Sequence, residues 1–363
     1  MAKAPKQQKQ KAAAADKWII YGATGYTGRL IAIEALKQGL RPTLAGRNPE
    51  KVAAIAEQMN LPWAAFSVDD KDAVRLALQD KTLLLSVAGP FSATANQMMD
   101  ACIETGTHYL DVTGEIDVFE LASRKDAAAK KAGITLLPGV GFDVVPSDCL
   151  AAHTAARSKS PVSLTLAIKS SGLASRGTAK TGIEGLGKGT AVRRDGKIEH
   201  VKAGSLLRDF DFGNGLEKYV GLSWGDVSTA FHSTGIGDID VYFPYEGPIK
   251  SMTKISRHMG LLMGMRFMQN FLKKQINKIP AGPTSQQRSG AGSMLRAEVT
   301  DENGSVFISQ LATPNGYSLT AQSAVLCSMK VMKGGIEHGF KTPSLAFGVA
   351  LLDELDGCKL ADH

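Results

Sequence analysis

The stretch that decides the fold is Trp18-Ile19-Ile20-Tyr21-Gly22-Ala23-Thr24-Gly25-Tyr26-Thr27-Gly28. Its apolar start predicts a strand, and a helix is expected from Gly28 to about Gln38, stopped by Gly39. In this GxxGxxG spacing Gly22 permits a tight turn, Gly25 lets the backbone approach a ligand, and Gly28 lets helix and strand pack closely. Since a helix N-terminus offers unpaired N–H groups to an anion, the stretch predicts a phosphate-binding βαβ unit. A glycine-rich turn without a ligand is the alternative.

Apolar runs and helical stretches alternate through the next hundred residues. Strands are expected at 43–45, 64–68, 82–87, 108–112 and 134–137, and helices beginning after Asn48 and at 70–79, 92–105 and 115–132. Asn48 is expected to cap its helix, with Pro49 in the first turn. Six strands with helices between them predict an α/β fold, a Rossmann-type doubly wound parallel sheet.

The pattern changes after Pro138. A helix is expected at 145–157. Residues 160–310 are rich in Gly, Thr and Ser, with strands at 163–169, 238–243 and 295–300, a hairpin turn at 301–304 and a return strand at 305–311. Helices return at 319–332 and 342–355. We therefore expect a basic disordered tail at 1–16, a Rossmann domain at 17–150, an α+β substrate or dimerisation domain at 151–312, and C-terminal helices at 313–363 that pack on the Rossmann domain.

Composition excludes several classes of protein. The net charge is +7, but the first 17 residues hold five lysines against one aspartate, so the remainder is too close to neutral for a nucleic-acid surface. The tail has no apolar signal segment, and a mitochondrial presequence is the alternative to a solvated extension. Four widely spaced cysteines without a CxxC pair argue against zinc and disulfides and favour the cytoplasm.

The most apolar helical stretch, Met259 to Leu272, is too short for a transmembrane span. A buried or interface helix is the preferred interpretation. A lipid-facing surface that makes peripheral membrane contact is the alternative, because methionine-rich surfaces adapt to varied ligands.

The residue after the second strand indicates the cofactor. An NAD site usually carries an acidic residue there, whereas this chain has Ala45-Gly46-Arg47. A guanidinium suits a 2′-phosphate by charge and by bidentate geometry, so NADP(H) is the predicted cofactor. A solvated surface arginine is the alternative.

Five blocks of sequence resemble the saccharopine dehydrogenase-like oxidoreductases, a family that includes trans-acting enoyl reductases. They are Gly22–Gly28 with Ala45–Arg47, Val87–Phe91, Gly106–Glu115, Pro138–Asp148, and Gly316–Ala321 with Thr342–Gly348. The resemblance implies that loops after the fourth, fifth and sixth strands line the cofactor, where parallel strands end. The implied cofactor-binding residues are Gly22, Thr24, Gly25, Tyr26, Thr27, Gly28, Arg47, Ala88, Gly89, Pro90, Thr113, Gly114 and Gly139.

Asp143 is the candidate catalytic proton donor, because it follows the glycines after the sixth strand. Its alternative role is to cap the helix that enters Pro146. The tyrosines form no Tyr-x-x-x-Lys pair, and no GxSxG, HExxH or metal-spaced Cys/His cluster occurs.

The expected function is NADPH-dependent reduction of a carbonyl, imine or enoyl compound, small or lipid-like. Saccharopine itself fits poorly, because no carboxylate-binding set is recognisable; Arg176, Lys180, Lys188, Arg193 and Arg194 could neutralise an acidic substrate or form a solvated face. The alternative function is a non-catalytic NADP(H) sensor or scaffold. A homodimer is compatible with either.

Overall fold

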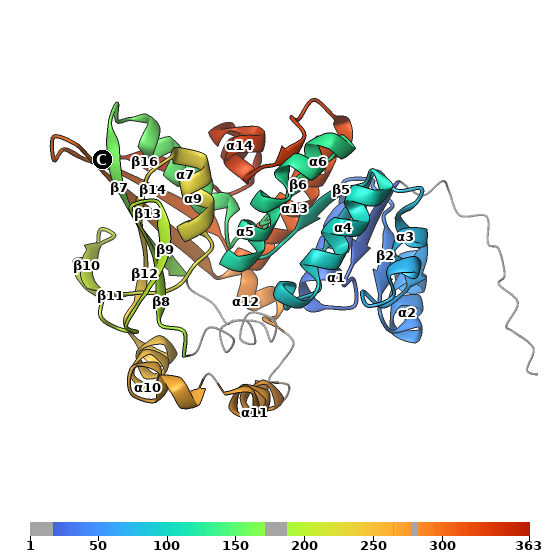
Figure 1. Ribbon diagram of the computed structural model, residues 1–363, viewed down its shortest axis with the longest axis horizontal. Helices are drawn as coiled ribbons and strands as arrows, with labels where there is room; N and C mark the ends of the chain where they lie inside the picture. Colours follow the sequence, from blue (N-terminus) through green and yellow to red (C-terminus); the bar gives the residue numbers. More distant parts are fainter. Residues whose placement is uncertain (1–16, 171–186, 264, 277–281) are drawn as a thin grey trace, which may run out of the picture.

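A parallel sheet forms the first half of the protein (Figure 1). The computed structural model describes residues 17–170, 187–263, 265–276 and 282–363. Among these, seven strands pair in the order β15-β6-β5-β4-β1-β2-β3, every neighbouring pair parallel. Their bounds are β1 Trp18–Tyr21, β2 Thr43–Gly46, β3 Trp63–Ala65, β4 Leu83–Ser86, β5 His108–Asp111, β6 Thr135–Leu137 and β15 Gly339–Phe340. The predicted Rossmann-type α/β fold is confirmed.

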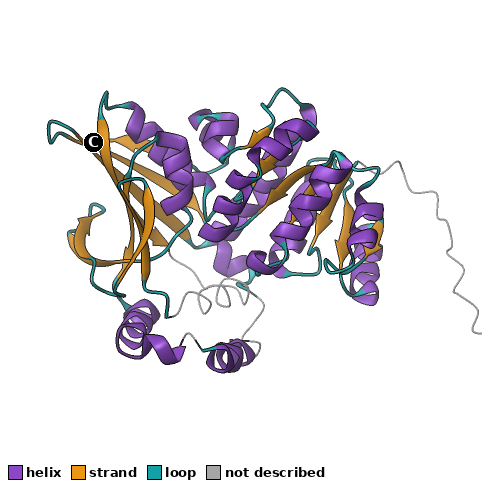
Figure 2. Cartoon of the chain, in the orientation of Figure 1, coloured by secondary structure: helices purple, strands orange, loops and turns teal. Residues whose placement is uncertain are grey.

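Helices cover both faces of this sheet, as Figure 2 shows. Alternate residues of a strand face opposite sides, so Trp18 and Ile20 enter one core while Ile19 and Tyr21 enter the other. The first core packs against α1 Tyr26–Lys37, α2 Pro49–Met59 and α13 Gly316–Lys333. The second packs against α3 Lys71–Leu78, α4 Ala95–Thr105, α5 Ile116–Arg124 and α6 Asp126–Ala132. This is the doubly wound arrangement.

The second sheet is mixed. Its described path runs β10-β11-β12-β7-β13-β14-β16, with β8 and β9 attached beside β12. The bounds are β7 Pro161–Ser170, β8 Thr190–Arg194, β9 Lys197–Val201, β10 Leu207–Asp211, β11 Leu216–Gly221, β12 Asp238–Pro244, β13 Gly292–Asp301, β14 Val306–Pro314 and β16 Lys359–Asp362. The hairpin expected at Asp301–Gly304 joins β13 to β14. Strands β8 to β11, which lie in the Gly-rich stretch, and β16, near the C-terminus, were not predicted from the sequence.

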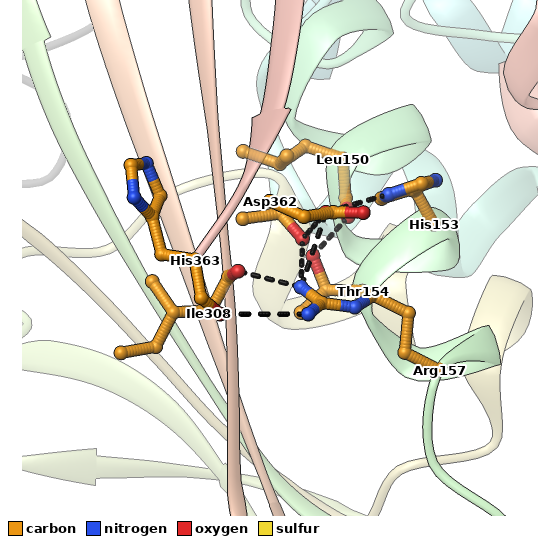
Figure 3. A network of polar contacts seen from close by, with 8 residues as sticks. Leu150, His153, Thr154, Arg157, Ile308, Asp362 and His363 are labelled. Atoms are coloured by element: carbon orange, nitrogen blue, oxygen red, sulfur yellow. Dashed lines mark hydrogen bonds and ion pairs between the residues drawn. The ribbon is translucent and has the colours of Figure 1, made fainter.

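Helix α7, Val145–Ala156, is fixed to the last strand by a polar network (Figure 3). The Asp362 carboxylate accepts hydrogen bonds from His153 Nε2 at 2.9 Å, Arg157 Nη1 at 3.1 Å and Ser309 Oγ at 2.7 Å. These bonds lower the pKa of Asp362, with the Ser309 bond contributing most. The C-terminal half of α7 is thereby held on the second sheet, while its first turn faces the Rossmann sheet's loops.

Two expected helices are interrupted. The helix expected at 115–132 breaks at Lys125 (φ −90°, ψ 2°), because Asp126 accepts a hydrogen bond from Phe340 N of β15 at 2.9 Å. The helix expected at 342–355 is α14 Pro343–Phe347 followed by a 3₁₀ turn, because Gly348 has φ 72°. Thr342 caps α14 as expected. Strand β15 was not anticipated.

The stretch 259–272 is not one helix. It spans the end of α10 Gly247–Met263 and most of α11 Arg266–Ile276. Met265 and Phe271 are exposed to 48% and 55%, so a single buried helix was a wrong prediction, whereas an interface role for the stretch stays a prediction. No helix of the described residues is long and apolar enough to cross a membrane. The tail 1–16, Arg176 and Lys180 lie outside the described residues.

An ionic cluster joins the two sheets' helices. Arg193 of β8 is 4% exposed and donates to Glu120 of α5 at 2.9 Å, to Val227 O at 2.7 Å and to Gly196 O at 2.6 Å. Ser228 of α9 (Asp226–Thr234) donates to the same Glu120 oxygen at 2.6 Å. The His232 ring contributes most to holding the pKa of Glu120 at about 2, followed by Ser228 and the Arg193 charge, against the opposing effect of burial.

Replacing Glu120 with Gln is expected to destabilise the protein by about 3 kcal/mol, because it leaves the buried Arg193 cation without its carboxylate. The pKa of Glu120 is depressed in the folded state, so its contribution is present above about pH 4.5, the ordinary value, and is lost as pH falls toward about 2. Urea unfolding across acid pH measures this, with Glu199→Gln as an exposed control. Equal stability of the two variants would contradict the assigned role.

Candidate cofactor and active site

The glycine loop sits at the carboxyl edge of the parallel sheet, between β1 and its two neighbours. Gly22 N and Ala23 N donate to Ala45 O of β2 at 2.9 and 3.1 Å. On the other side, a Cβ on Gly22 would lie 2.8 Å from Ala88 N, after β4. Strand order changes direction at β1 and β4, and this is the crevice where open α/β sheets bind ligands.

Gly22, Gly25 and Gly28 differ in how much space surrounds them. Gly22 has φ +93° and touches backbone, and a Cβ on Gly28 would lie 2.4 Å from Gly22 O. Gly25, the residue before α1, is exposed, and its Cβ would meet only Gly22 O at 3.3 Å. The protein's own packing therefore requires Gly22 and Gly28, whereas at Gly25 the open space lies where a ligand would approach.

Gly25→Ala and Gly28→Ala are therefore expected to fail in different ways. Gly28→Ala places a methyl group against backbone that cannot move aside, and unfolding is expected to become easier by about 3 kcal/mol. Gly25→Ala should keep the melting temperature near that of the wild type and weaken nucleotide binding about tenfold. Thermal melts and calorimetric titration measure the two properties. A normal affinity for Gly25→Ala would remove the loop from the binding site.

Arg47 lies next to this loop. It is exposed and follows Gly46, whose Cβ would lie 4.0 Å from the Thr24 side chain of the loop. Burial raises the pKa of the Tyr21 hydroxyl, and the Arg47 charge opposes that rise, which places the guanidinium near the end of β1. No ion pair holds Arg47 within the described part of the chain. The guanidinium is therefore available to an anionic ligand beside the glycine loop.

The loop after β4 is held open by a carboxylate. Gly89 is exposed and precedes Pro90 through a cis peptide bond. Glu115 accepts hydrogen bonds from Phe91 N at 2.9 Å and Ser92 N at 2.7 Å. Thr94 Oγ1 donates to Ala88 O at 3.1 Å. These bonds leave the Ala88–Pro90 backbone at the sheet edge, beside Gly22.

Asp111 connects the loops after β5 and β6. Its buried carboxylate accepts from Tyr109 Oη at 2.7 Å and from Thr113 N and Gly139 N, each at 2.9 Å. Thr113 is 1% exposed, and its hydroxyl accepts from Glu115 N at 3.0 Å. Both loops are thus fixed by one fully buried carboxylate.

Gly114 and Gly139 occupy different positions in these loops. Gly139 is buried with φ +79°, and a Cβ there would lie 2.9 Å from Phe119 and from Val144, so the turn itself requires glycine. Gly114 is half-buried, and its Cβ would lie 3.1 Å from Asp143 Cβ and Oδ2. The structure thus brings Gly114 next to Asp143. Gly139 instead packs against the Phe119 and Val144 side chains and faces no open space.

Asp143 belongs to the loop after β6 and lies beside Gly114 of the loop after β5. The next residue, Val144, occupies the N-cap position of α7, and no side chain caps that helix, so Asp143 is not a cap. Burial of the carboxyl raises its pKa to about 6. C-terminal helix α13 supports the loop: Phe142 N donates to Thr320 Oγ1 at 2.9 Å, and Ser323 Oγ donates to Val140 O at 2.8 Å. The loop that carries the Asp143 carboxyl is thereby held at the sheet edge.

Two further carboxyls, Asp148 and Asp226, are buried, and the charges of both Asp148 and Asp143 act on Asp226. Asp148 of α7 accepts from Ser344 N at 2.7 Å and from Ser233 Oγ. Asp226, the first residue of α9, is 0% exposed, and burial and then the Asp148 charge raise its pKa well above the ordinary value. The described residues contain no group of His, Cys, Asp or Glu side chains arranged to hold a metal.

Of the five basic residues considered for an acidic substrate, the three that the structure describes each lie near a carboxylate. Arg193 pairs with Glu120, Arg194 pairs with Asp240 at 2.7 Å, and Lys188 lies 3.9 Å from Asp117.

A separate hollow of about 330 Å³ lies where β1, β2 and β3 begin, at the opposite edge from the glycine loop, and is lined by Ile19, Thr43, Pro62, Trp63, Ala64, Leu76, Ala77, Asp80 and Lys81. Its position separates it from the candidate site.

Sequence reasoning missed the residues that support the site from afar. Asp111 and Thr320 occur in blocks that resemble the family, but neither was singled out there. Asp226 occurs in no such block. The partner of Tyr26, Arg288, lies 262 residues further along the chain. Residue spacing gives no signal for such contacts.

Comparison with known proteins agrees with this geometry. Residues 18–137 match the family model described as the saccharopine dehydrogenase NADP binding domain. An Arabidopsis thaliana protein named as a mitochondrial saccharopine dehydrogenase-like oxidoreductase is 29% identical over 147 residues, 36% of this chain and 32% of its own. A trans-acting enoyl reductase of Mycobacterium ulcerans is 30% identical over 149 residues, 37% of this chain and 34% of its own.

The fold extends beyond these alignments. Apo saccharopine dehydrogenase (L-Glu forming) of Saccharomyces cerevisiae superposes with a TM-score of 0.67 at 12% identity, over 95% of this chain and 99% of that one. The curated relatives are matched over only about a third to a half of their length. Residues 18–137 thus match a nucleotide-cofactor-binding domain, and over about a third to a half of its length the chain is similar to saccharopine dehydrogenase-like oxidoreductases.

Proposed function

We propose that the protein is an NADPH-dependent oxidoreductase that reduces a carbonyl, imine or enoyl group. The observation that carries the proposal is one sheet edge that gathers the glycine loop, the exposed Arg47 and the Asp143 carboxyl. Arg47 would receive the 2′-phosphate, and the N-terminus of α1 the diphosphate. When bound, the nicotinamide supplies the hydride.

In this proposal the chain's own residues orient the cofactor and deliver a proton. The backbone of Ala88–Pro90 and Gly114 would lie along the nicotinamide half, and Gly139 would shape the turn behind it. Asp143, with a pKa of about 6, would donate a proton to the atom that gains negative charge as the substrate is reduced.

The second sheet and its helices form the proposed substrate domain. Exposed apolar side chains on α10, on α11 and at Met265 between them favour an apolar, lipid-like substrate; on the helices they are Met252, Ile255 and Phe271. The name of the mycobacterial relative, a trans-acting enoyl reductase, points the same way. A cytoplasmic location is proposed with it, and cell fractionation distinguishes it from the mitochondrial location named for the plant relative.

Calorimetric titration of the wild-type protein with NADPH and with NADH tests the cofactor assignment. Tight NADPH binding with weaker NADH binding is the expected result. Substrates are then screened by NADPH oxidation, beginning with enoyl and keto thioesters. NADPH binding without turnover of any reducible substrate would favour a sensor or scaffold. Absence of binding by either nucleotide would overturn the assignment.

A further inference from the structure

A segment that follows α11 reaches across to the glycine loop. Tyr26, the first residue of α1, donates from its hydroxyl to Pro283 O at 2.5 Å. Arg288 Nη1 donates to the same hydroxyl at 2.7 Å and to Pro283 O at 3.2 Å. A Cβ on Gly282 would lie 2.7 Å from the Tyr26 ring, so chain and ring are in close contact. The segment 282–290 therefore rests on the phosphate loop.

A capping box within the segment 282–290 fixes its backbone locally. Thr284 and Gln287 form a capping box: Gln287 N donates to Thr284 Oγ1 at 3.3 Å, and Thr284 N donates to Gln287 Oε1 at 2.8 Å. This starts the short helix α12, Ser285–Ser289, and sets the backbone from which Arg288 projects. Figure 1 shows α12 between the Rossmann half and the second sheet.

Tyr26 is also held from its other side. Tyr317, in the first turn of α13, meets the Tyr26 ring edge-on, with centroids 5.2 Å apart and planes at 89°. The Arg288 guanidinium carbon lies 5.9 Å from the Tyr26 ring centroid. The ring is thus packed between α13 and Arg288, and the guanidinium is kept beside the first residue of α1.

Among the described residues, no acidic side chain balances the charge of Arg288. Within the described part of the chain no carboxylate pairs with it, and its hydrogen bonds to Tyr26 and Pro283 both use Nη1. A guanidinium has five N–H donors, so most of its capacity is left over. It stands next to the helix end where unpaired N–H groups already favour an anion.

We propose that Arg288 is an additional cofactor ligand, which pairs with the diphosphate seated at the N-terminus of α1. The inference rests on the proposed cofactor-binding function and deepens it, because it makes a segment of the substrate domain part of the nucleotide site. The diphosphate is common to NADPH and NADH, so Arg288 acts on both nucleotides. Arg47 acts on the 2′-phosphate alone.

Calorimetric titration of Arg288→Gln with NADPH and with NADH tests this assignment. We expect both affinities to fall about tenfold, with their ratio unchanged and with the melting temperature of the free protein close to wild type. Arg124→Gln removes one exposed positive charge elsewhere and should bind both nucleotides as the wild type does. Tyr26→Phe keeps the ring but loses the hydroxyl that holds Arg288, and should weaken both nucleotides by about threefold.

The outcomes separate the two proposals. Unchanged affinities in Arg288→Gln, or a loss confined to NADPH, overturn the role of Arg288 while the cofactor assignment stands. A lower melting temperature with normal affinities identifies Arg288 as a structural clamp, which also overturns it. If the wild-type protein binds neither nucleotide, the cofactor assignment and this inference fall together.

Discussion

Asp143→Asn is expected to lower the turnover number for substrate reduction by roughly 10²- to 10⁴-fold while NADPH binds as before. The amide keeps the size of the carboxyl but has no acidic proton to give. Burial raises the pKa of Asp143 to about 6, so the wild-type rate should fall as pH rises above about 6, where the donor loses its proton. The asparagine variant should lack that fall.

The measurement is NADPH oxidation with the best substrate, followed on both sides of pH 6. Asp226→Asn is the matched control, because it removes a neighbouring buried carboxyl that belongs to α9 and not to the loop after β6. It should retain the pH dependence. Asp143 would lose the proton-donor role if Asp143→Asn kept the wild-type rate, and Asp226 would take it if the control lost the dependence instead.

Arg47→Asp is expected to weaken NADPH binding about 100-fold and to leave NADH binding near its wild-type strength. The 2′-phosphate loses two charge-assisted hydrogen bonds and gains a repulsive carboxylate, whereas the two hydroxyls of NADH find an acceptor. Titration of the variant with each nucleotide gives the two dissociation constants.

Arg124→Asp carries the same charge change on the exposed end of α5 and serves as the control. Its affinities should differ little from the wild type. Equal losses toward NADPH and NADH in Arg47→Asp would show that the residue contacts a part shared by both nucleotides, and the NADP(H) preference would then be wrong.

The parallel sheet could be predicted because its signals are local. Each strand from β1 to β6 is a short apolar run, and Asn48 and Thr342 cap the helices that follow them. Strand β15 has only two residues, too few to show a pattern, and it exists because it pairs with β6. The break at Lys125 likewise depends on Asp126 meeting Phe340, which no window of sequence contains.

The candidate site divides in the same way. The sequence by itself determined the glycine loop, Arg47 and the position of Asp143, because parallel strands deliver their following loops to one edge. Only the tertiary structure decided that Glu115 holds the Phe91 loop, that Asp111 joins two loops, and that Arg288 reaches Tyr26. Those contacts form between segments that folding brings together, and local residue patterns carry no information about partners so distant in the chain.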